Sequence, residues 1–213
     1  MLRELISNDW YTILFVLSLI AITLAKYLYS VRFAAFLTVI GNSQYVKRYA
    51  KDSKFVDQFN SLLFINQIIA FSTFTFIVYN QFFTPIVFDI LLFLKLSLGI
   101  IGFIWLKVLL ERFIANILDI SDLITPYLFQ KINSKNYTGL VLFPINLTLI
   151  FAVEPTDHWI YSIFILLIFI NLISFITSFK THQKLILNNF LYFILYLCTL
   201  EIAPYIILYK LLS

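Results

Sequence analysis

Charged residues, histidine, cysteine and glycine are all scarce in this 213-residue chain. Only 12% of its residues are charged, about half the share found in soluble domains, whereas 62% are hydrophobic. A water-soluble fold of this length cannot bury so many long apolar runs, so we expect lipid to surround most of the polypeptide. The predicted fold class is therefore all-α, a polytopic membrane helical bundle with about six transmembrane helices.

The shortage of reactive side chains argues against an enzyme. The two histidines, His158 and His182, are each alone, and the single cysteine, Cys198, excludes an intramolecular disulfide. No cluster of His and Cys can therefore hold zinc, and the four glycines form no P-loop, dinucleotide fingerprint or nucleophile elbow. The carboxylates of Asp119 and Asp122 lack the companion motif of a magnesium site. We expect no metal, no cofactor and no catalytic activity.

Six apolar runs approach the ~20 residues that a helix needs to cross the hydrocarbon layer. They form a single predicted domain, residues 1–213, with helices at 10–29, 61–83, 85–110, 137–153, 159–179 and 186–208. The first helix is expected to extend through the apolar residues 31–40, and a short re-entrant turn after it is the alternative. Residues 111–125 alternate apolar and acidic faces at helical spacing, which predicts an interfacial amphipathic helix ending at Pro126, and residues 53–60 are a second candidate.

Basic residues are concentrated in alternate connections between the predicted helices. Alternate connections lie on the same side of the membrane. Because Lys and Arg in short loops stay cytoplasmic, the side with these basic connections is predicted to be the cytoplasmic one. Only Arg3 and Lys210 fall on the other side, so both termini are expected to be extracytoplasmic. The topology also explains the net charge of +4 without nucleic acid as a partner. The cytoplasmic set comprises Arg32, Lys47, Arg48, Lys51, Lys54, Arg112, Lys131, Lys135, Lys180 and Lys184.

Four of these basic residues lie close together in the first cytoplasmic connection. Lys47, Arg48, Lys51 and Lys54 are expected to contact anionic lipid headgroups, each contributing about 1 kcal/mol.

Two ionisable residues lie within predicted spans, where an unpaired charge is costly. Lys95 in the third helix and Glu201 in the sixth are expected at a similar depth, with Asn146 of the fourth helix in the same layer. We predict that the three form a buried polar centre. Pro144 and Pro204 remove backbone donors beside it and are expected to kink their helices. The pair either locks two helices together or serves as a relay or substrate contact, and both roles stay open.

Other polar and small residues inside the spans predict helix packing. Asn66, Gln67 and Asn171 are expected to form hydrogen bonds between helices. Gly99 and Gly102, three residues apart, are expected to allow a close approach of two helices.

The closing segment, residues 195–210, contains Glu201-Ile-Ala-Pro204. This motif, together with the chain length and the six-helix layout, resembles a bacterial membrane family catalogued as domain of unknown function 4271. The resemblance implies a location in the bacterial inner membrane and no established activity.

Two classes of function fit these observations. The first is a non-enzymatic scaffold, assembly or accessory subunit of an envelope complex, with the lipid bilayer and other membrane or envelope proteins as partners. The second is a small transporter, flippase or proton-coupled component that uses Lys95 and Glu201. Stable co-purification with envelope proteins would favour the first class, and a water-filled cavity reaching Glu201 would favour the second.

Overall fold

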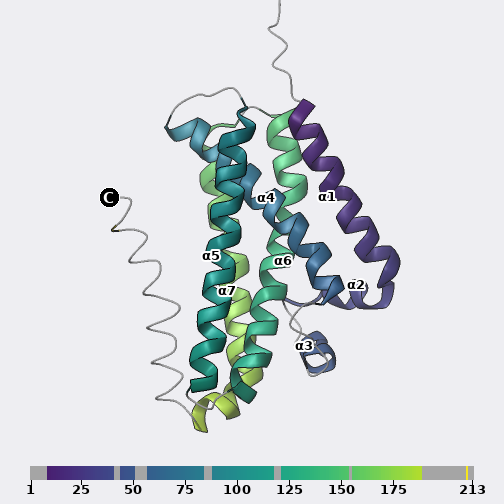
Figure 1. Cartoon of the computed structure of the whole chain (residues 1–213), viewed down its shortest axis with the longest axis vertical. Helices are drawn as coiled ribbons and strands as arrows, with labels where there is room; N and C mark the ends of the chain where they lie inside the picture. The colour runs from purple at the N-terminus through teal and green to yellow at the C-terminus, as the bar shows by residue number, and fades with distance from the viewer. Residues whose placement is uncertain are drawn as a thin grey trace, which may run out of the picture.

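A computed structural model of the chain describes residues 9–40, 44–50, 57–83, 88–117, 121–153, 155–188 and 210. Five long helices lie side by side within these ranges, each antiparallel to the one before it, and two short helices lie at one end of the bundle (Figure 1). The elements are α1 (Asp9–Leu28), α2 (Ser30–Phe36), α3 (Gln44–Tyr49), α4 (Gln58–Phe82), α5 (Ile90–Ile117), α6 (Ser121–Phe151) and α7 (Asp157–Asn188).

Four of the described helices are long and apolar enough to cross a membrane: α1, α4, α5 and the Asp157–Ser178 part of α7. Their outward faces carry large apolar side chains, such as Leu98 and Ile165, each about two-thirds exposed. Exposed apolar surface on this scale indicates contact with lipid rather than water. The described helices are therefore compatible with a multi-pass membrane protein. The predicted span at residues 186–208 lies almost entirely outside the described residues.

The predicted interfacial helix over residues 111–125 is wrong as a separate element. The last turns of α5 cover its first part, and α6, which begins at Ser121, covers the rest. Glu111 is fully buried while Phe113 points outward, so the first acidic residue of this pattern packs against protein instead of water. Pro126 lies inside α6 and ends no helix. It is the sixth residue of α6, so its missing N–H removes one hydrogen bond of the second turn.

The predicted extension of the first helix through residues 31–40 is also wrong. Helix α1 ends at Leu28, and α2 starts after the non-helical residue Tyr29. The Tyr29 hydroxyl donates to Gln58 Oε1 at 2.7 Å, and its ring meets the Phe59 ring edge-on. These contacts with the start of α4 hold the bend that turns the chain beneath α1 (Figure 1).

The core of the bundle is the contact between α4 and α6. Gly139 of α6 lies so close to α4 that an added Cβ would be 2.6 Å from the Cα of Gln67. Glycine is required there because any side chain would push the two helices apart. At Gly99 and Gly102, an added Cβ would meet no atom of the described residues within 4 Å, so the close packing predicted there is not seen among the described helices and stays a prediction.

Polar side chains inside the bundle join α1 to α4. The Ser18 hydroxyl donates to Asn66 Oδ1 at 2.5 Å, which confirms the hydrogen bond between helices predicted for Asn66. Gln67 is buried beside Gly139. Asn171, in contrast, donates to the Leu167 carbonyl of its own helix, α7, and no hydrogen bond from it to another described helix is seen.

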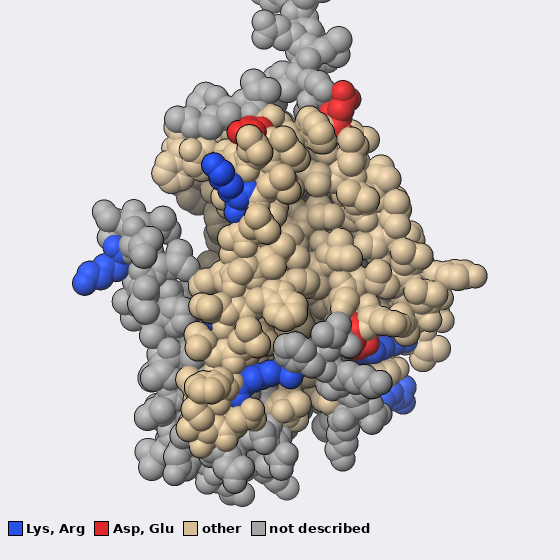
Figure 2. Space-filling model, in the orientation of Figure 1, with Lys and Arg blue, Asp and Glu red and all other residues tan. Residues whose placement is uncertain are grey.

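The charged residues of the described helices lie toward the two ends, and an uncharged band separates them on the face seen in Figure 2. Asp9, Asp89 and Asp157 lie where α1, α5 and α7 begin. We call the other end, where α1, α5 and α7 finish, the basic end. It carries Lys26, Arg32, Lys107, Arg112, Lys131 and Lys135.

Candidate functional site

The basic end is closed on one side by a cap, which consists of α2 and α3. Arg32 of α2 forms an ion pair with Asp57, the residue before α4, and donates from Nε to the Tyr45 hydroxyl at 3.3 Å. Its guanidinium also lies over the Tyr49 and Phe59 rings, at 5.1 and 4.7 Å from their centroids. These partners hold the guanidinium charged and raise the pKa of Arg32. Arg32 therefore fixes Asp57 in place.

Tyr45 attaches α3 to the bundle. Its ring stacks on Phe129 of α6, with 5.8 Å between centroids, and its hydroxyl donates to Asn133 Oδ1 at 3.2 Å. Burial raises the pKa of Tyr45 to about 12, so the hydroxyl keeps its proton at physiological pH. The cap is thus packed and hydrogen-bonded against α6.

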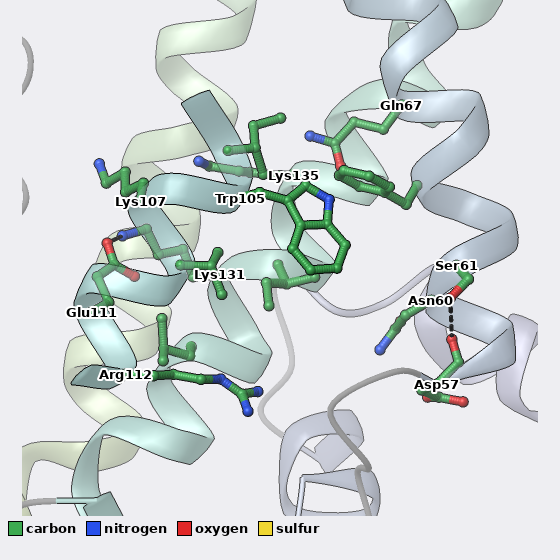
Figure 3. Close-up of a pocket in the computed structure, with 15 residues that line it drawn as sticks. Asp57, Asn60, Ser61, Gln67, Trp105, Lys107, Glu111, Arg112, Lys131 and Lys135 are labelled. Atoms are coloured by element: carbon green, nitrogen blue, oxygen red, sulfur yellow. Dashed lines mark hydrogen bonds and ion pairs between the residues drawn. The ribbon is translucent and has the colours of Figure 1, made fainter. Parts of the chain in front are cut away.

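Beside the cap, α4, α5 and α6 enclose a cavity of about 130 Å³, which we call the basic pocket. Figure 3 shows Lys107, Glu111 and Lys131 on one side and Asp57 and Asn60 on the other. The described lining residues are Asp57, Asn60, Ser61, Phe64, Gln67, Ile104, Trp105, Lys107, Val108, Glu111, Arg112, Leu128, Lys131, Ile132 and Lys135.

Helical spacing gathers the charges of the basic pocket. Lys107 and Glu111 are four residues apart on α5, as are Lys131 and Lys135 on α6, so each pair lies on one face of its helix. The Lys131 ammonium donates to Glu111 Oε1 at 2.5 Å. Glu111 is fully buried, and this partner offsets the cost of burying its carboxylate.

Positive charge exceeds negative charge in the basic pocket. Four of its described lining residues are basic and two are acidic. Both acidic groups already have cationic partners, because Asp57 pairs with Arg32 and Glu111 with Lys131. Lys107 is itself only 4% exposed. This balance favours an anion as the group that the pocket accepts.

The pocket also offers apolar wall and unpaired acceptors. Trp105, 44% exposed, and apolar residues of all three helices line it beside the charges. Within the described part of the chain, Glu111 Oε2 and Asn60 Oδ1 are buried without a hydrogen-bond partner. Such atoms are costly unless a donor reaches them. These two acceptors therefore call for a donor group, whereas the cationic side chains beside the apolar wall suit an anionic group attached to an apolar body.

The structure describes two of the three residues of the buried polar centre that the sequence predicts. Lys95 is exposed on α5, five residues after that helix begins, whereas Asn146 is fully buried and donates to the Ala70 carbonyl at 2.7 Å. The described residues therefore place Lys95 and Asn146 in different surroundings. Glu201 lies outside the described residues, so its pairing with Lys95 stays a prediction.

The residues of the predicted helix kinks and of the predicted headgroup contacts are also only partly described by the structure. Pro144 lies inside α6, and Pro204 lies outside the described residues. Arg48 is exposed on α3, the side opposite the one that packs on the bundle. The side chain of Lys47, and all of Lys51 and Lys54, lie outside the described part of the chain.

Sequence reasoning assigned the charges of the basic pocket to membrane topology and to the polar face of an interfacial helix. The four-residue spacings in α5 and α6 were the available signal. Without the fold, nothing in the sequence shows that these faces meet each other and the start of α4.

The family comparison covers almost the whole chain. The family model described as Domain of unknown function (DUF4271) matches residues 11–212. The chain belongs to this family. No curated protein and no solved structure matches this DUF4271 chain. All residues of the basic pocket and of the cap lie within the matched range.

Proposed function

We propose that this DUF4271 protein is a small, non-enzymatic transport component of the bacterial inner membrane that binds an anionic amphiphile from the cytoplasmic side. The basic pocket carries the proposal, since it combines an excess of cationic side chains with apolar wall. A phosphorylated lipid fits both features, because its headgroup would meet the lysines while its chains remain in hydrocarbon. A binding role requires no catalytic motif.

The proposed topology has six spans and both termini outside the cytoplasm. The distribution of Lys and Arg supports it, because the basic end of the described bundle would face the cytoplasm. The sixth span is assigned to residues 186–208 from their apolar sequence. In this orientation the basic pocket lies near the cytoplasmic headgroup layer.

A role confined to scaffolding accounts less well for the basic pocket. Burying a Glu–Lys pair stabilises a bundle no better than well-packed apolar residues would. The contact of Asn146 with the Ala70 carbonyl does not distinguish the two roles, because buried amide and hydroxyl side chains commonly join membrane helices.

Trp105 provides the test, because it lies in the pocket while Trp10 and Trp159 are at the opposite end and about half exposed. A Trp10→Phe/Trp159→Phe background leaves Trp105 as the only indole. In detergent micelles, phosphatidic acid with brominated chains should quench its fluorescence more strongly than brominated phosphatidylcholine. Equal quenching by the two lipids would refute the proposal.

Charge-neutralised variants identify the source of any preference. Arg112→Gln with Lys135→Gln should weaken the preference for phosphatidic acid by about tenfold or more, as expected for two lost charge-assisted contacts. Lys26→Gln, which removes an exposed charge at the end of α1 outside the pocket, is the matched control and should leave the preference unchanged. Loss of the preference in Lys26→Gln alone would contradict the assignment to the pocket. Mild-detergent purification of the same protein reveals whether envelope proteins accompany it, as a scaffold would require.

A further inference from the structure

A second hollow, of about 370 Å³, lies between α6 and α7 on the other side of the α6 lysines. Lys131 and Lys135 line both this hollow and the basic pocket. The two sites are therefore neighbours that share these two lysines. We call the second one the amide hollow, after Gln130 and Asn171 in its wall.

Uncharged polar side chains line the amide hollow from both helices. Gln130 and Ser134 are four residues apart on α6, and Asn171 and Ser174 are three apart on α7, so each pair lies on one helical face. Helix α7 is otherwise strongly apolar. This polar face is therefore not explained by exposure to lipid.

Several polar atoms of the amide hollow have no partner. Gln130 is 1% exposed, and both its amide nitrogen and its oxygen are buried without a hydrogen bond in the described structure. The Ser134 hydroxyl, in a residue 4% exposed, is likewise unpaired. An unpaired amide presents one acceptor and two donor hydrogens, which matches a group that both donates and accepts. Hydroxyl groups have this property.

The charges around the amide hollow distinguish between headgroups. Its described lining residues include Lys131 and Lys135 but no carboxylate. An ammonium-bearing headgroup such as ethanolamine would meet like charge there and no counter-ion among the described lining residues. An uncharged, hydroxylated substituent would meet Gln130 and Ser134 instead.

We propose that the amide hollow receives the hydroxyl-bearing substituent of a lipid phosphate whose phosphate lies at Lys131 and Lys135. The ligand class is then a polyhydroxylated phospholipid, with glycerol or a sugar esterified to the phosphate. This inference rests on the proposed function, because it assigns the headgroup of the same amphiphile.

The experiment uses the full chain with Trp105 as its only indole. Three lipids with brominated chains are compared: phosphatidylglycerol, phosphatidylmethanol and phosphatidylethanolamine. The first two carry the same charge and differ in the hydroxyls. Phosphatidylglycerol should bind roughly three- to tenfold more tightly than phosphatidylmethanol, the ratio expected for one or two net hydrogen bonds. Phosphatidylethanolamine should bind most weakly.

The variant Gln130→Leu/Ser134→Ala tests the hollow itself. It removes unpaired polar atoms and keeps similar volumes, so the bundle should fold. It should bind phosphatidylglycerol and phosphatidylmethanol equally, with the affinity for phosphatidylmethanol unchanged, and that unchanged affinity also shows that the variant is folded. A Ser162→Ala variant, exposed at the other end of α7, is the control.

The outcomes separate this inference from the proposed function. If neither anionic lipid binds better than phosphatidylcholine, the proposed function fails. If both anionic lipids bind equally well to the parent protein, or if the variant keeps the preference, the inference alone is overturned. Displacement of the lipid by water-soluble glycerol phosphate at a similar concentration would show that the ligand is not a lipid and would also overturn it.

Discussion

Replacing Gly139 by alanine should separate α4 from α6. The new Cβ would lie 2.6 Å from the Gln67 Cα, whereas ordinary contacts begin at 3.4 Å, so the helices must move apart by about 0.8 Å or bend locally. The obstructing atom is backbone, and no change of rotamer relieves the clash. Because α4 and α6 form the most extensive helix contact in the bundle, we expect the packing penalty to be about 1–3 kcal/mol.

Gly99→Ala and Gly102→Ala are matched controls. Both positions are helical, and at both the new Cβ would meet no atom of the described residues within 4 Å. Replacing glycine by alanine inside a helix should raise the free energy of unfolding by up to about 1 kcal/mol through helix propensity. The same propensity gain applies at Gly139, where the packing penalty opposes it. The stability difference between Gly139→Ala and either control therefore isolates the packing term.

The assay is equilibrium unfolding in mixed micelles, with sodium dodecyl sulfate as denaturant and circular dichroism as the signal. Gly139→Ala should unfold at a lower denaturant fraction than both controls. It should also weaken ligand binding, because Gln67 lines the basic pocket. If Gly139→Ala is as stable as Gly102→Ala, the close approach of α4 and α6 is refuted.

Three further predictions concern the polar contacts, and the same unfolding assay measures each. Lys131→Met should destabilise by about 3–5 kcal/mol because it leaves the buried Glu111 carboxylate unpaired, and adding Glu111→Gln should recover much of that loss; an additive double variant would contradict the coupling. Asn146→Leu should cost about 1 kcal/mol through the lost hydrogen bond to α4, and an unchanged stability would remove Asn146 from the helix contact. Arg32→Lys keeps the charge beside Asp57 but loses the contacts with two rings, so it should cost about 1 kcal/mol and speed amide hydrogen exchange in α2 and α3; unchanged exchange would show that the cap is held by other contacts.

The apolar runs of the sequence predicted helix bounds well where the apolar run is as long as the helix itself. The predicted spans at 10–29 and 61–83 agree with α1 and α4 to within three residues at each end. The span at 137–153 is only the second half of α6, because hydropathy does not register a helix that continues past its apolar part. For the same reason the segment 111–125 was misread, since an amphipathic pattern does not say whether its polar face meets water or protein.

The candidate site was less predictable than the spans. The search for isolated charges within predicted spans selected Lys95, which is exposed, and did not select Lys107 or Glu111, which are buried. Those two residues lie near a predicted span end, where charge is ordinary. The carboxylate of Glu111 is paired with Lys131, which is 20 residues further along the chain.

The sequence alone determined the all-helical class, the expectation of a lipid environment and the resemblance to the family, because each depends on local composition or on a short motif. Only the tertiary structure decided which polar faces meet. The basic pocket, the amide hollow and the need for glycine at Gly139 each arise from residues far apart in the chain. Antiparallel helices bring such residues together in a register that side-chain packing sets, and no local pattern encodes that register.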